Sequence, residues 1–348
     1  MIQRNLILHL LSVILLFVMI SCSGNQQNAK QETKAVKETS EPKVEINNEA
    51  KALLSALNEM GDYVNSRNFP SLIKASTVYD ELDGNILVID LRSEDLYAEG
   101  HIKNAVNVDF SDLPSYFAND IDPAKYDKII LTCYAGQMSS YSTSLLRLAG
   151  YNNVFAMKWG MSSWNKYFAK DFWLDVVSSE FQEKLDTLGN EAGDVGDFPK
   201  MNTGKTAGSE ILKTRIDSLF AQGMRAAIIH ADEVFEDPST YYVINYDRKD
   251  KYESGHIPGA VRYKPGATLG IVSEMQTIPT DKTVVIYCNT GQNSAFATAY
   301  LRLFGYSAKS LLYGNNSFMY DRMKQEQDSL SWIPFTGAEI HDYPYVKN

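Results

Sequence analysis

Short apolar runs alternate with longer amphipathic segments along most of the chain. Two nearly continuous apolar runs, Ile86 to Asp90 and Ile129 to Thr132, are typical of strands that are covered on both faces of a parallel sheet. The segment from Ser139 to Ala149 follows with leucines at helical spacing, and Gly150 stands where a helix C-cap belongs. This alternation predicts an α/β fold, a mostly parallel sheet with helices on both faces.

The same pattern occurs a second time, 155 residues later. Glu99 to Val106 has the sequence EGHIKNAV, and Ser254 to Val261 has the sequence SGHIPGAV. The strands that end at Cys133 and Cys288 have the same offset, and so do the two helices that follow them. Because three motifs share one register, and because this offset is far longer than the repeat of a solenoid, the pattern predicts a duplicated domain.

The chain begins with a pattern that is typical of export. Arg4 is the only charged residue before an apolar run from Leu6 to Ile20, which is shorter than the roughly 20 residues of a membrane span. The run ends at Met19-Ile20-Ser21-Cys22, which resembles a bacterial lipobox. The resemblance implies lipidation of Cys22 and a membrane-anchored protein of the bacterial cell envelope, on the periplasmic or outer-membrane face. A plain secretory signal cut near Ser21 and an uncleaved anchor remain alternatives.

Changes in composition divide the rest of the chain. From Ser23 to about Ala50 the residues are polar and charged, which predicts a flexible tether, with a charge-rich helix as the alternative. A polar, glycine-rich stretch from Glu180 to Thr206 is the expected linker between the copies. The predicted segments are a signal peptide at 1–22, a tether at 23–50, a first domain at 51–172, a linker at 173–204, a second domain at 205–335 and a tail at 336–348. We expect the last residues, from Ser331 onward, to form a tail that packs on the second copy.

The composition is that of an ordinary globular protein, with 44% apolar and 22% charged residues. The net charge of −10 argues against a wide basic face and therefore against a nucleic-acid partner. Three cysteines are too few for a disulfide scaffold. No group of His and Cys has metal-ligand spacing and no glycine-rich nucleotide loop occurs, so we expect neither a metal nor a cofactor.

Two of the cysteines stand in the same pattern, C-x-x-G-x-x-S, between a predicted strand and a predicted helix. Backbone N–H groups and the helix dipole converge at such a point, so we expect Cys133 and Cys288 to be accessible nucleophiles with lowered thiol pKa values. The glycine lets the backbone turn over the sulfur, and the serine can cap the helix. The expected substrate-binding loops are Tyr134, Ala135, Gly136, Gln137, Met138 and Ser139 in the first copy and Asn289, Thr290, Gly291, Gln292, Asn293 and Ser294 in the second.

Together these motifs resemble the rhodanese (sulfurtransferase) family. The strand-end cysteine in C-x-x-G-x-x-S, the preceding G-H-I-x-x-A and the helix that ends in Gly-Tyr occur in both copies, over about 50–170 and 205–330. The resemblance implies two tandem rhodanese-like domains and a catalytic role for Cys133 and Cys288. Each cysteine would take the outer sulfur of a small donor such as thiosulfate, hold it as a persulfide and pass it to a thiophilic acceptor.

The copies depart from the family pattern in their charged residues. Neither loop carries the Arg or Lys that many thiosulfate-active members have beside the cysteine. The first copy has Asp90-Leu91-Arg92, the D-x-R that the resemblance makes a structural pair, whereas the second has Asn245-Tyr246-Asp247 in register. The resemblance also gives His101 and His256 a structural role.

The two loops also differ from each other. Gln292-Asn293 should give the second loop a more polar rim than Gln137-Met138 gives the first. A polar rim favours a hydrated anionic donor, so we expect Cys288 to carry most of the thiosulfate turnover. Arg147 and Arg302 lie in the helices after the loops and are expected to be solvated or salt-bridged, with substrate steering as the alternative.

Other functions fit the two cysteines less well. A phosphatase or arsenate reductase on this scaffold needs an arginine six residues after the cysteine, where this chain has Ser139 and Ser294. A non-enzymatic sulfur-carrier or protein-binding module on the envelope is the main alternative. The remaining alternatives are two plain core cysteines, or a disulfide between Cys133 and Cys288, for which equivalent sites of two domains are poorly placed.

Overall fold

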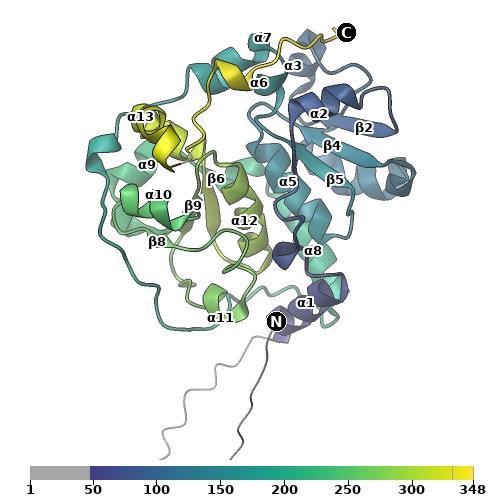
Figure 1. Cartoon of the computed structure of the whole chain (residues 1–348). Coiled ribbons are helices and arrows are strands. Elements are labelled where there is room, and N and C mark those ends of the chain that lie inside the picture. Colours follow the sequence, from purple (N-terminus) through teal and green to yellow (C-terminus); the bar gives the residue numbers. More distant parts are fainter. Residues whose placement is uncertain (1–47, 331, 348) are drawn as a thin grey trace, which may run out of the picture. The chain divides into compact units, whose positions relative to one another are not determined.

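The computed structural model of the chain describes residues 48–330 and 332–347 (Figure 1). The predicted signal peptide with Cys22, and the predicted tether up to residue 47, lie outside the described residues. The first helix, α1 (Asn48–Glu59), takes up the last three residues of the predicted tether. Among the described residues, no helix is long and apolar enough to cross a membrane.

The first half is built on a parallel sheet of five strands in the order β1-β5-β4-β2-β3. The strands are β1 (Leu72–Ile73), β2 (Ile86–Asp90), β3 (Val106–Asn107), β4 (Lys128–Thr132) and β5 (Val154–Met157). The helices are α2 (Ala75–Asp80), α3 (Glu94–Glu99), α4 (Leu113–Ser115), α5 (Gln137–Leu148), α6 (Met161–Trp164) and α7 (Lys166–Ala169). A parallel sheet with connecting helices is the predicted α/β architecture.

The second half repeats this sheet, with five parallel strands in the order β6-β10-β9-β7-β8. The strands are β6 (Ile228–Ile229), β7 (Tyr242–Asn245), β8 (Val261–Arg262), β9 (Val284–Tyr287) and β10 (Ala308–Leu311). The helices are α8 (Gly208–Ala221), α9 (Ala231–Glu236), α10 (Lys249–Ser254), α11 (Val272–Met275), α12 (Gln292–Leu303) and α13 (Tyr320–Leu330). The prediction of a duplicated α/β unit is confirmed.

The central strands are covered on both faces, which explains their continuous apolar sequences. In β4, Ile129 and Leu131 belong to the large hydrophobic core that the two halves share, whereas Ile130 packs into a separate core on the other face. β9 is divided in the same way between the shared core and a core of the second half. Alternate residues of a strand point to opposite faces, so the middle of a strand that is buried on both sides is apolar at successive positions.

The repeat offset changes twice along the chain. It is 156 residues at strands β1 and β6 and at helices α2 and α9, 155 residues from the ends of β2 and β7 to helices α5 and α12, and 154 residues at strands β5 and β10. The turn between helix and strand is one residue shorter in the second half, since β5 begins four residues after Gly150 and β10 begins three residues after Gly305. Residues beyond this turn are therefore equivalent at an offset of 154.

Helices α5 and α12 pack against each other and join the two halves. Nearly every residue of both helices is buried, and many of these residues are Ser, Ala or Thr. Ser144 Oγ crosses the interface and donates to Phe296 O over 3.0 Å. A second contact brings α1 of the first half against α8 of the second. Since α5 and α12 each begin at a cysteine loop, this packing brings the two loops to the same interface.

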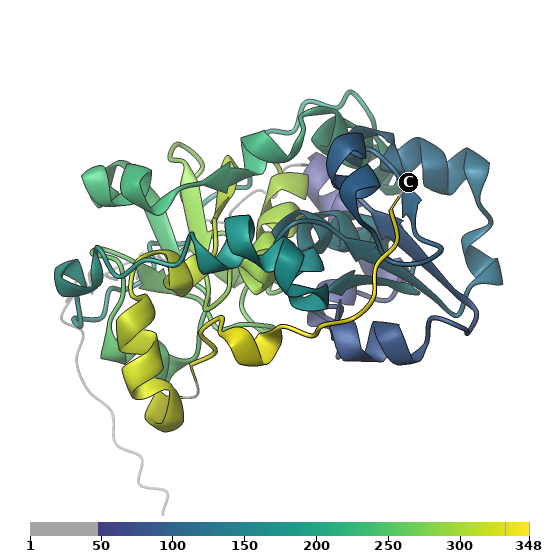
Figure 2. The same ribbon diagram turned by 90° about the horizontal axis from the view of Figure 1, so that it is seen from above.

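The C-terminal tail packs on the first half, so the prediction that it packs on the second copy is wrong. Val346 and His101 form an antiparallel bridge with N–H···O distances of 2.9 Å in both directions, and Tyr343 stacks on Tyr79. Figure 2 shows the yellow C-terminal segment beside the blue elements of the first half. Trp332, at the start of the segment for which this packing is expected, does pack in the core of the second half, so the prediction holds there. Aromatic tail residues can dock on any apolar face, and their sequence does not say which.

The segment predicted as the linker packs along the second half. Asp186 bridges His256 in antiparallel fashion, with N–H···O distances of 2.8 and 2.9 Å. Further along, Gly196 N–H donates to Gln276 O over 2.9 Å, and Phe198 lies beside Phe304 with 5.6 Å between the ring centroids. The segment therefore also contributes to the packing of the second half.

Candidate functional site

Cys133 follows strand β4 and begins the loop that leads into helix α5. Gly136 has a φ of 90°, a conformation that favours glycine, and this turns the loop back over the sulfur. The N–H groups of Gly136 and Ser139 donate to Cys133 Sγ over 3.2 and 3.4 Å, and Ser139 Oγ lies 3.5 Å from the sulfur. The first thiol thus faces main-chain donors at the start of a helix.

Cys288 has similar surroundings after strand β9. Gly291 has a φ of 76°, and Ser294 N–H donates to Cys288 Sγ over 3.4 Å. Ser294 Oγ lies 3.6 Å from the sulfur, and the N–H of Thr290 also hydrogen-bonds it. Main-chain donors at a helix N-terminus stabilise a thiolate or a persulfide anion, so both loops can hold a negatively charged sulfur.

Both thiols are buried, so the prediction that they are accessible is wrong. Only 1% of each cysteine is exposed. Burial raises the pKa of the Cys288 thiol, the Asp247 carboxylate raises it further, and the hydrogen bonds from Ser294 and Thr290 offset this only in part. The predicted lowering of the thiol pKa is therefore wrong for Cys288. Cys133 and Cys288 are free and form no disulfide.

Two glutamines connect the loops across the interface. Gln137 Nε2 donates to Gly291 O over 3.2 Å and to Leu311 O over 3.1 Å, and Gln137 Oε1 accepts from Tyr313 N–H over 2.7 Å. In the opposite direction, Gln292 Oε1 accepts from Trp159 N–H over 2.8 Å. Both glutamine side chains are buried, so they form no part of an exposed rim. The two glutamines therefore give no support to the expectation that a polar rim favours thiosulfate at Cys288, whereas Met138 and Asn293 are partly exposed.

In each domain a further glycine lies close to the cysteine loop: Gly160 in the first and Gly314 in the second. A Cβ on Gly160 would collide with the carbonyl oxygen of Cys133, and a Cβ on Gly314 would collide with that of Cys288. Both glycines have a positive φ, of 59° and 55°. The main chain can approach each cysteine this closely because no side chain intervenes.

Comparison with known families identifies these two units. Residues 74–167 and 232–319 match the family model of the rhodanese-like domain, and together they make up more than half of the chain. The chain belongs to the rhodanese-like family. It carries two rhodanese-like domains in tandem, as the sequence predicts, and each matched stretch contains one cysteine loop.

Solved structures with some similarity carry related titles. A rhodanese-related protein from Thermoplasma volcanium is 24% identical over 27% of this chain and 89% of that chain, with a TM-score of 0.25. A rhodanese-like domain protein from Staphylococcus aureus is 19% identical over 26% of this chain and 87% of that chain, with a TM-score of 0.24. A thiosulfate sulfurtransferase from Pseudomonas aeruginosa is 19% identical over 76% of this chain and 46% of that chain, with a TM-score of 0.28.

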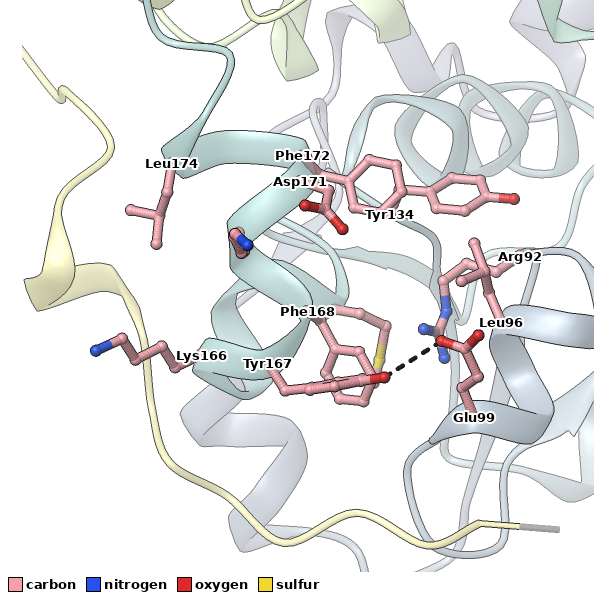
Figure 3. A pocket seen from close by; sticks show the side chains of 12 residues that line it. Arg92, Leu96, Glu99, Tyr134, Lys166, Tyr167, Phe168, Asp171, Phe172 and Leu174 are labelled. Atoms are coloured by element: carbon pink, nitrogen blue, oxygen red, sulfur yellow. Dashed lines mark hydrogen bonds between the residues drawn. The ribbon is translucent and has the colours of Figure 1, made fainter.

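A cavity of about 560 Å³ lies beside the loop of the first rhodanese-like domain (Figure 3). Tyr134, which directly follows Cys133, forms part of its wall and packs against Phe172 with 4.7 Å between the ring centroids. The charged residues that line it are Arg92, Lys166, Lys170, Glu99 and Asp171. Three of these residues are cations and two are carboxylates, and the charge of Arg92 is balanced by its buried partner Asp90.

Arg92 has two roles at this cavity. Its Nη2 lies 2.7 Å from Asp90 Oδ2 in a buried ion pair and also donates to Gly100 O over 2.6 Å. The guanidinium also lies 5.0 Å from the ring centroid of Phe168. These contacts agree with the structural pairing that the family resemblance implies for Asp90 and Arg92. They also fix a positive charge in the cavity wall.

The second domain has different residues at the positions that line this cavity. Asp247 stands at the position of Arg92, Lys251 at that of Leu96 and Asn289 at that of Tyr134, each at an offset of 155. Asn315 stands at the position of Met161, at the offset of 154. All four second-domain residues are buried. The neighbouring Arg248 does not replace Arg92, because it pairs with the partly exposed Asp250 over 3.0 Å.

Asp247 carries a negative charge into the interior of the second domain. Asn315 Nδ2 donates to Asp247 Oδ2 over 3.1 Å, and the main-chain N–H of Asn289 also hydrogen-bonds the carboxylate. Burial raises the pKa of Asp247 to about 6, although Lys251 and these hydrogen bonds lower it. This carboxyl group therefore exchanges its proton close to neutral pH.

Several amide groups around Asp247 lack hydrogen-bond partners. Among the described residues, both Oδ1 and Nδ2 of Asn289 are buried without a partner, and so is Oδ1 of Asn315. An unpaired buried amide group costs about 1–3 kcal/mol. Such groups are retained where a substrate or a water completes their hydrogen bonds.

The histidines and arginines of the repeated motifs outside the loops have structural partners. His101 and His256 each stack on a tyrosine of the preceding helix, with 3.8 Å between the ring centroids. Each histidine also forms a hydrogen bond between its Nδ1 and the main-chain carbonyl of that tyrosine, which fits the structural role expected of them. Arg147 and Arg302 are buried and donate to the carbonyls of Val154 and Ala308, so the prediction of solvated or salt-bridged arginines is wrong.

Sequence reasoning missed the residues that distinguish the two sites. The sequence indicates Arg92 only as part of a structural D-x-R pair and Asp247 only as a departure from that pair in the second copy. It gives no reason to single out Asn315. The signal was present, because the repeat register places Arg92 against Asp247. Their proximity to the cysteine loops required the fold, since the loops and these residues come from different strands. Among the described residues, no group of three or more His, Cys, Asp or Glu could hold a metal ion.

Proposed function

We propose that the protein is a sulfurtransferase that moves sulfane sulfur from a donor such as thiosulfate to a thiophilic acceptor through cysteine persulfides. One observation carries this proposal: in both rhodanese-like domains a free thiol at a strand end accepts main-chain N–H groups at the start of a helix. That arrangement suits a sulfur anion that is formed and consumed in turn.

The reaction at Cys133 would run in two steps. The thiolate attacks the outer sulfur of thiosulfate, the S–S bond of the donor breaks, and sulfite leaves with the electron pair of that bond. The persulfide that forms accepts the N–H groups of Gly136 and Ser139. A thiophilic acceptor then takes the outer sulfur and restores the thiolate.

We assign the anionic donor to the first domain. The cavity beside Tyr134 carries Arg92, Lys166 and Lys170, whereas the second domain has Asp247 in place of Arg92. The buried Asp247 carboxylate repels a dianion at the second site, whereas the first site has an arginine at this position whose charge is balanced by Asp90. Tyr134 is the candidate gate, because it lines the cavity and directly follows the buried Cys133 in the chain.

A mass measurement tests this proposal. The full-length chain, purified in detergent, is treated with thiosulfate and its intact mass is compared with that of Cys133→Ala, Cys288→Ala and the double variant. We expect the mass of one sulfur atom to be gained on Cys133 and lost again when cyanide is added. A chain that gains no sulfur on either cysteine from thiosulfate or polysulfide would overturn the proposal.

The burial of both thiols favours a second candidate, a non-catalytic sulfur-carrier or protein-binding module. Such a module would bind sulfur or a partner without repeated turnover. The two candidates separate when thiosulfate and cyanide are both supplied in excess: an enzyme forms many molecules of thiocyanate per chain, and a carrier forms at most one per cysteine.

We also propose that the protein is anchored in the bacterial cell envelope by a lipid on Cys22. The proposal rests on the apolar run from Leu6 to Ile20 and the lipobox-like Met19-Ile20-Ser21-Cys22. Labelling with radioactive palmitate should mark the unmodified chain and not the Cys22→Ser variant. Equal labelling of both would refute the anchor.

A further inference from the structure

The strongest unexplained feature is the buried polar cluster at the second cysteine. Asn245 at the end of β7 pairs with Tyr287 at the end of β9. Asp247 lies two residues beyond Asn245, and Cys288 lies one residue beyond Tyr287. The main-chain N–H that follows Cys288 in the chain, that of Asn289, hydrogen-bonds the Asp247 carboxylate. The fold therefore sets a carboxylate beside the sulfur at the ends of two paired strands.

The charges around Asp247 leave this carboxylate without a close ion-pair partner. Lys251 and Arg262 face it from α10 and β8, and neither lies within 4 Å of it in a salt bridge. Lys251 Nζ instead lies 5.0 Å from the ring centroid of Trp332, and Arg262 Nε donates to the main-chain oxygen of Asp247 over 3.0 Å. Tyr287 and Cys288 are the other titratable groups that face the carboxylate.

The unpaired amide atoms point to a ligand. Asn289 is 6% exposed, its side-chain Nδ2 and Oδ1 have no partner among the described residues, and Asn315 Oδ1 is also unpaired. Together with the Asp247 carboxylate, these buried side chains offer one amide donor group and two amide acceptors. A small molecule with a hydrogen to donate and no negative charge matches this set.

We propose that the Cys288 site delivers its sulfur to a small uncharged thiol, and that Asp247 takes the proton of that thiol and returns it to Cys288. This inference rests on the proposed sulfurtransferase function and names the acceptor class of its second site. An acceptor with a carboxylate is excluded by repulsion from Asp247. The equivalent position in the first domain is a cation, so the preference belongs to the second site alone.

The step balances without another reactant. The Asp247 carboxylate takes the S–H proton of the acceptor thiol, RSH, and the thiolate attacks the outer sulfur of the protonated persulfide Cys288–S–SH. A bond forms between the acceptor sulfur and the outer sulfur, and the bond between that sulfur and Cys288 Sγ breaks. Cys288 leaves as a thiolate and receives the proton from Asp247, so that Cys288–S–SH and RSH become Cys288–SH and RSSH.

Two acceptors of nearly equal size test the charge preference: 2-mercaptoethanol, which is neutral, and mercaptoacetate, which carries a carboxylate. The full-length Cys133→Ala chain is loaded with excess colloidal elemental sulfur, an uncharged sulfane donor, then desalted and discharged to each thiol while its intact mass is followed. We expect discharge to the neutral thiol to be faster by about tenfold or more, the scale of one charge–charge contact in a partly buried site. The matched control is the Cys288→Ala chain loaded on Cys133, which should show no such preference and so removes the intrinsic reactivity of the two thiols.

Asp247→Asn should abolish the preference and slow discharge to the neutral thiol. In the unmodified site this rate should rise as the pH passes through about 6, when the carboxylate becomes free to accept a proton, and the variant should lack that rise. Lys251→Met should move the rise to higher pH, because the lysine charge lowers the pKa of Asp247. Persulfide formation on Cys133 in the Asp247→Asn chain reports whether that variant is folded.

The outcomes separate this inference from the function on which it rests. If Cys288 loads and discharges equally well to both thiols, or if Asp247→Asn and Lys251→Met leave both the ratio and the pH profile unchanged, the inference is wrong and the sulfurtransferase function stands. The inference is also wrong if Cys133 loads and Cys288 takes no sulfur from elemental sulfur, which carries no charge. If neither cysteine takes sulfur from any donor, the proposed function itself fails.

Discussion

The two domains hold their sulfur atoms alike and surround them differently. In both, the main chain supplies the donors, a positive-φ glycine turns the loop, and a serine six residues after the cysteine lies near the sulfur. Around this shared frame, Arg92 in the first domain corresponds to the buried Asp247 in the second, and a cavity wall corresponds to a closed amide cluster. The two domains thus share the main-chain donors to the sulfur, whereas their different side chains determine which substrates each site can bind.

The largest effect that separates the two sites should be seen in thiosulfate turnover. Cys133→Ala should reduce the formation of thiocyanate from thiosulfate and cyanide by at least about 100-fold, because it removes the nucleophile of the domain that has no carboxylate at the position of Asp247. Cys288→Ala should leave most of that activity, since Asp247 already repels a dianion from the second site. A steady-state assay of the full-length chain measures both.

The opposite ranking would be informative. A larger loss in Cys288→Ala would mean that the charges at positions 92 and 247 do not govern donor choice. It would restore the ranking expected from the loop sequences alone. Activity in the double variant equal to that of the unmodified chain would remove both cysteines from the reaction.

The second contrast concerns the arginines near the two D-x-R positions. Arg92→Met should destabilise the protein by about 3–5 kcal/mol, because it leaves the carboxylate of Asp90 buried without its partner. Arg248→Met should change the free energy of unfolding by less than about 0.5 kcal/mol, since Arg248 and its partner Asp250 are both solvent-exposed. Urea unfolding of the two variants provides the measurement. In the Asp90→Asn, Arg92→Met double variant part of the loss should be recovered, and equal effects of the two single variants would contradict this contrast.

Much of the fold follows from local sequence, and the reason is visible in β4. Ile129, Ile130 and Leu131 are apolar in succession because one face packs into the shared core and the other into a separate core. The repeat register then predicts the second sheet from the first. The position of each cysteine at a strand end also follows, because the strand pattern stops at Cys133 and Cys288.

The contacts between the two halves could not be predicted from the sequence. Gln137 and Gln292 are polar loop residues that a sequence places at a rim, yet each inserts into the other half and is buried. The tail is similar, since nothing local to Tyr343 indicates that it stacks on Tyr79 of the first half. The same interface buries the thiols, which is why local reasoning about Cys288 gave the wrong direction for its pKa.

A third contrast uses pH to expose the buried carboxylate. The pKa of Asp247 is about 6 in the folded chain against an ordinary value of 3.8, so the folded state binds more protons between these values. Stability should therefore fall as the pH rises from about 4 to 6, by up to about 3 kcal/mol, and stay lower above pH 6. Asp247→Asn should remove this loss and raise the melting temperature at pH 7.5 but not at pH 4.

The matched control has the opposite sign. Hydrogen bonds from Ser239 hold the pKa of the exposed Asp237 below its usual value, so its contribution is present at neutral pH and is lost as the pH falls. Asp237→Asn should therefore lower the melting temperature slightly at pH 7.5 and have no effect in acid. If Asp247→Asn also lowered the melting temperature at pH 7.5, burial would not be raising the pKa of Asp247. The two sites would then differ in shape and not in the charge of this residue.

The smallest effect should separate the two glutamines. Gln137→Ala removes hydrogen bonds to Gly291, Leu311 and Tyr313 and should cost about 2–3 kcal/mol, measured by urea unfolding. Gln292→Ala removes a single bond, to Trp159, and should cost about 1 kcal/mol, because it also removes an Nε2 group that has no partner among the described residues. Both variants should speed alkylation of the thiols by iodoacetamide, since each loosens the contact between the cysteine loops. Alkylation at an unchanged rate would show that the thiols are reached by a route that leaves this interface closed, and would shift attention to Tyr134 as the gate.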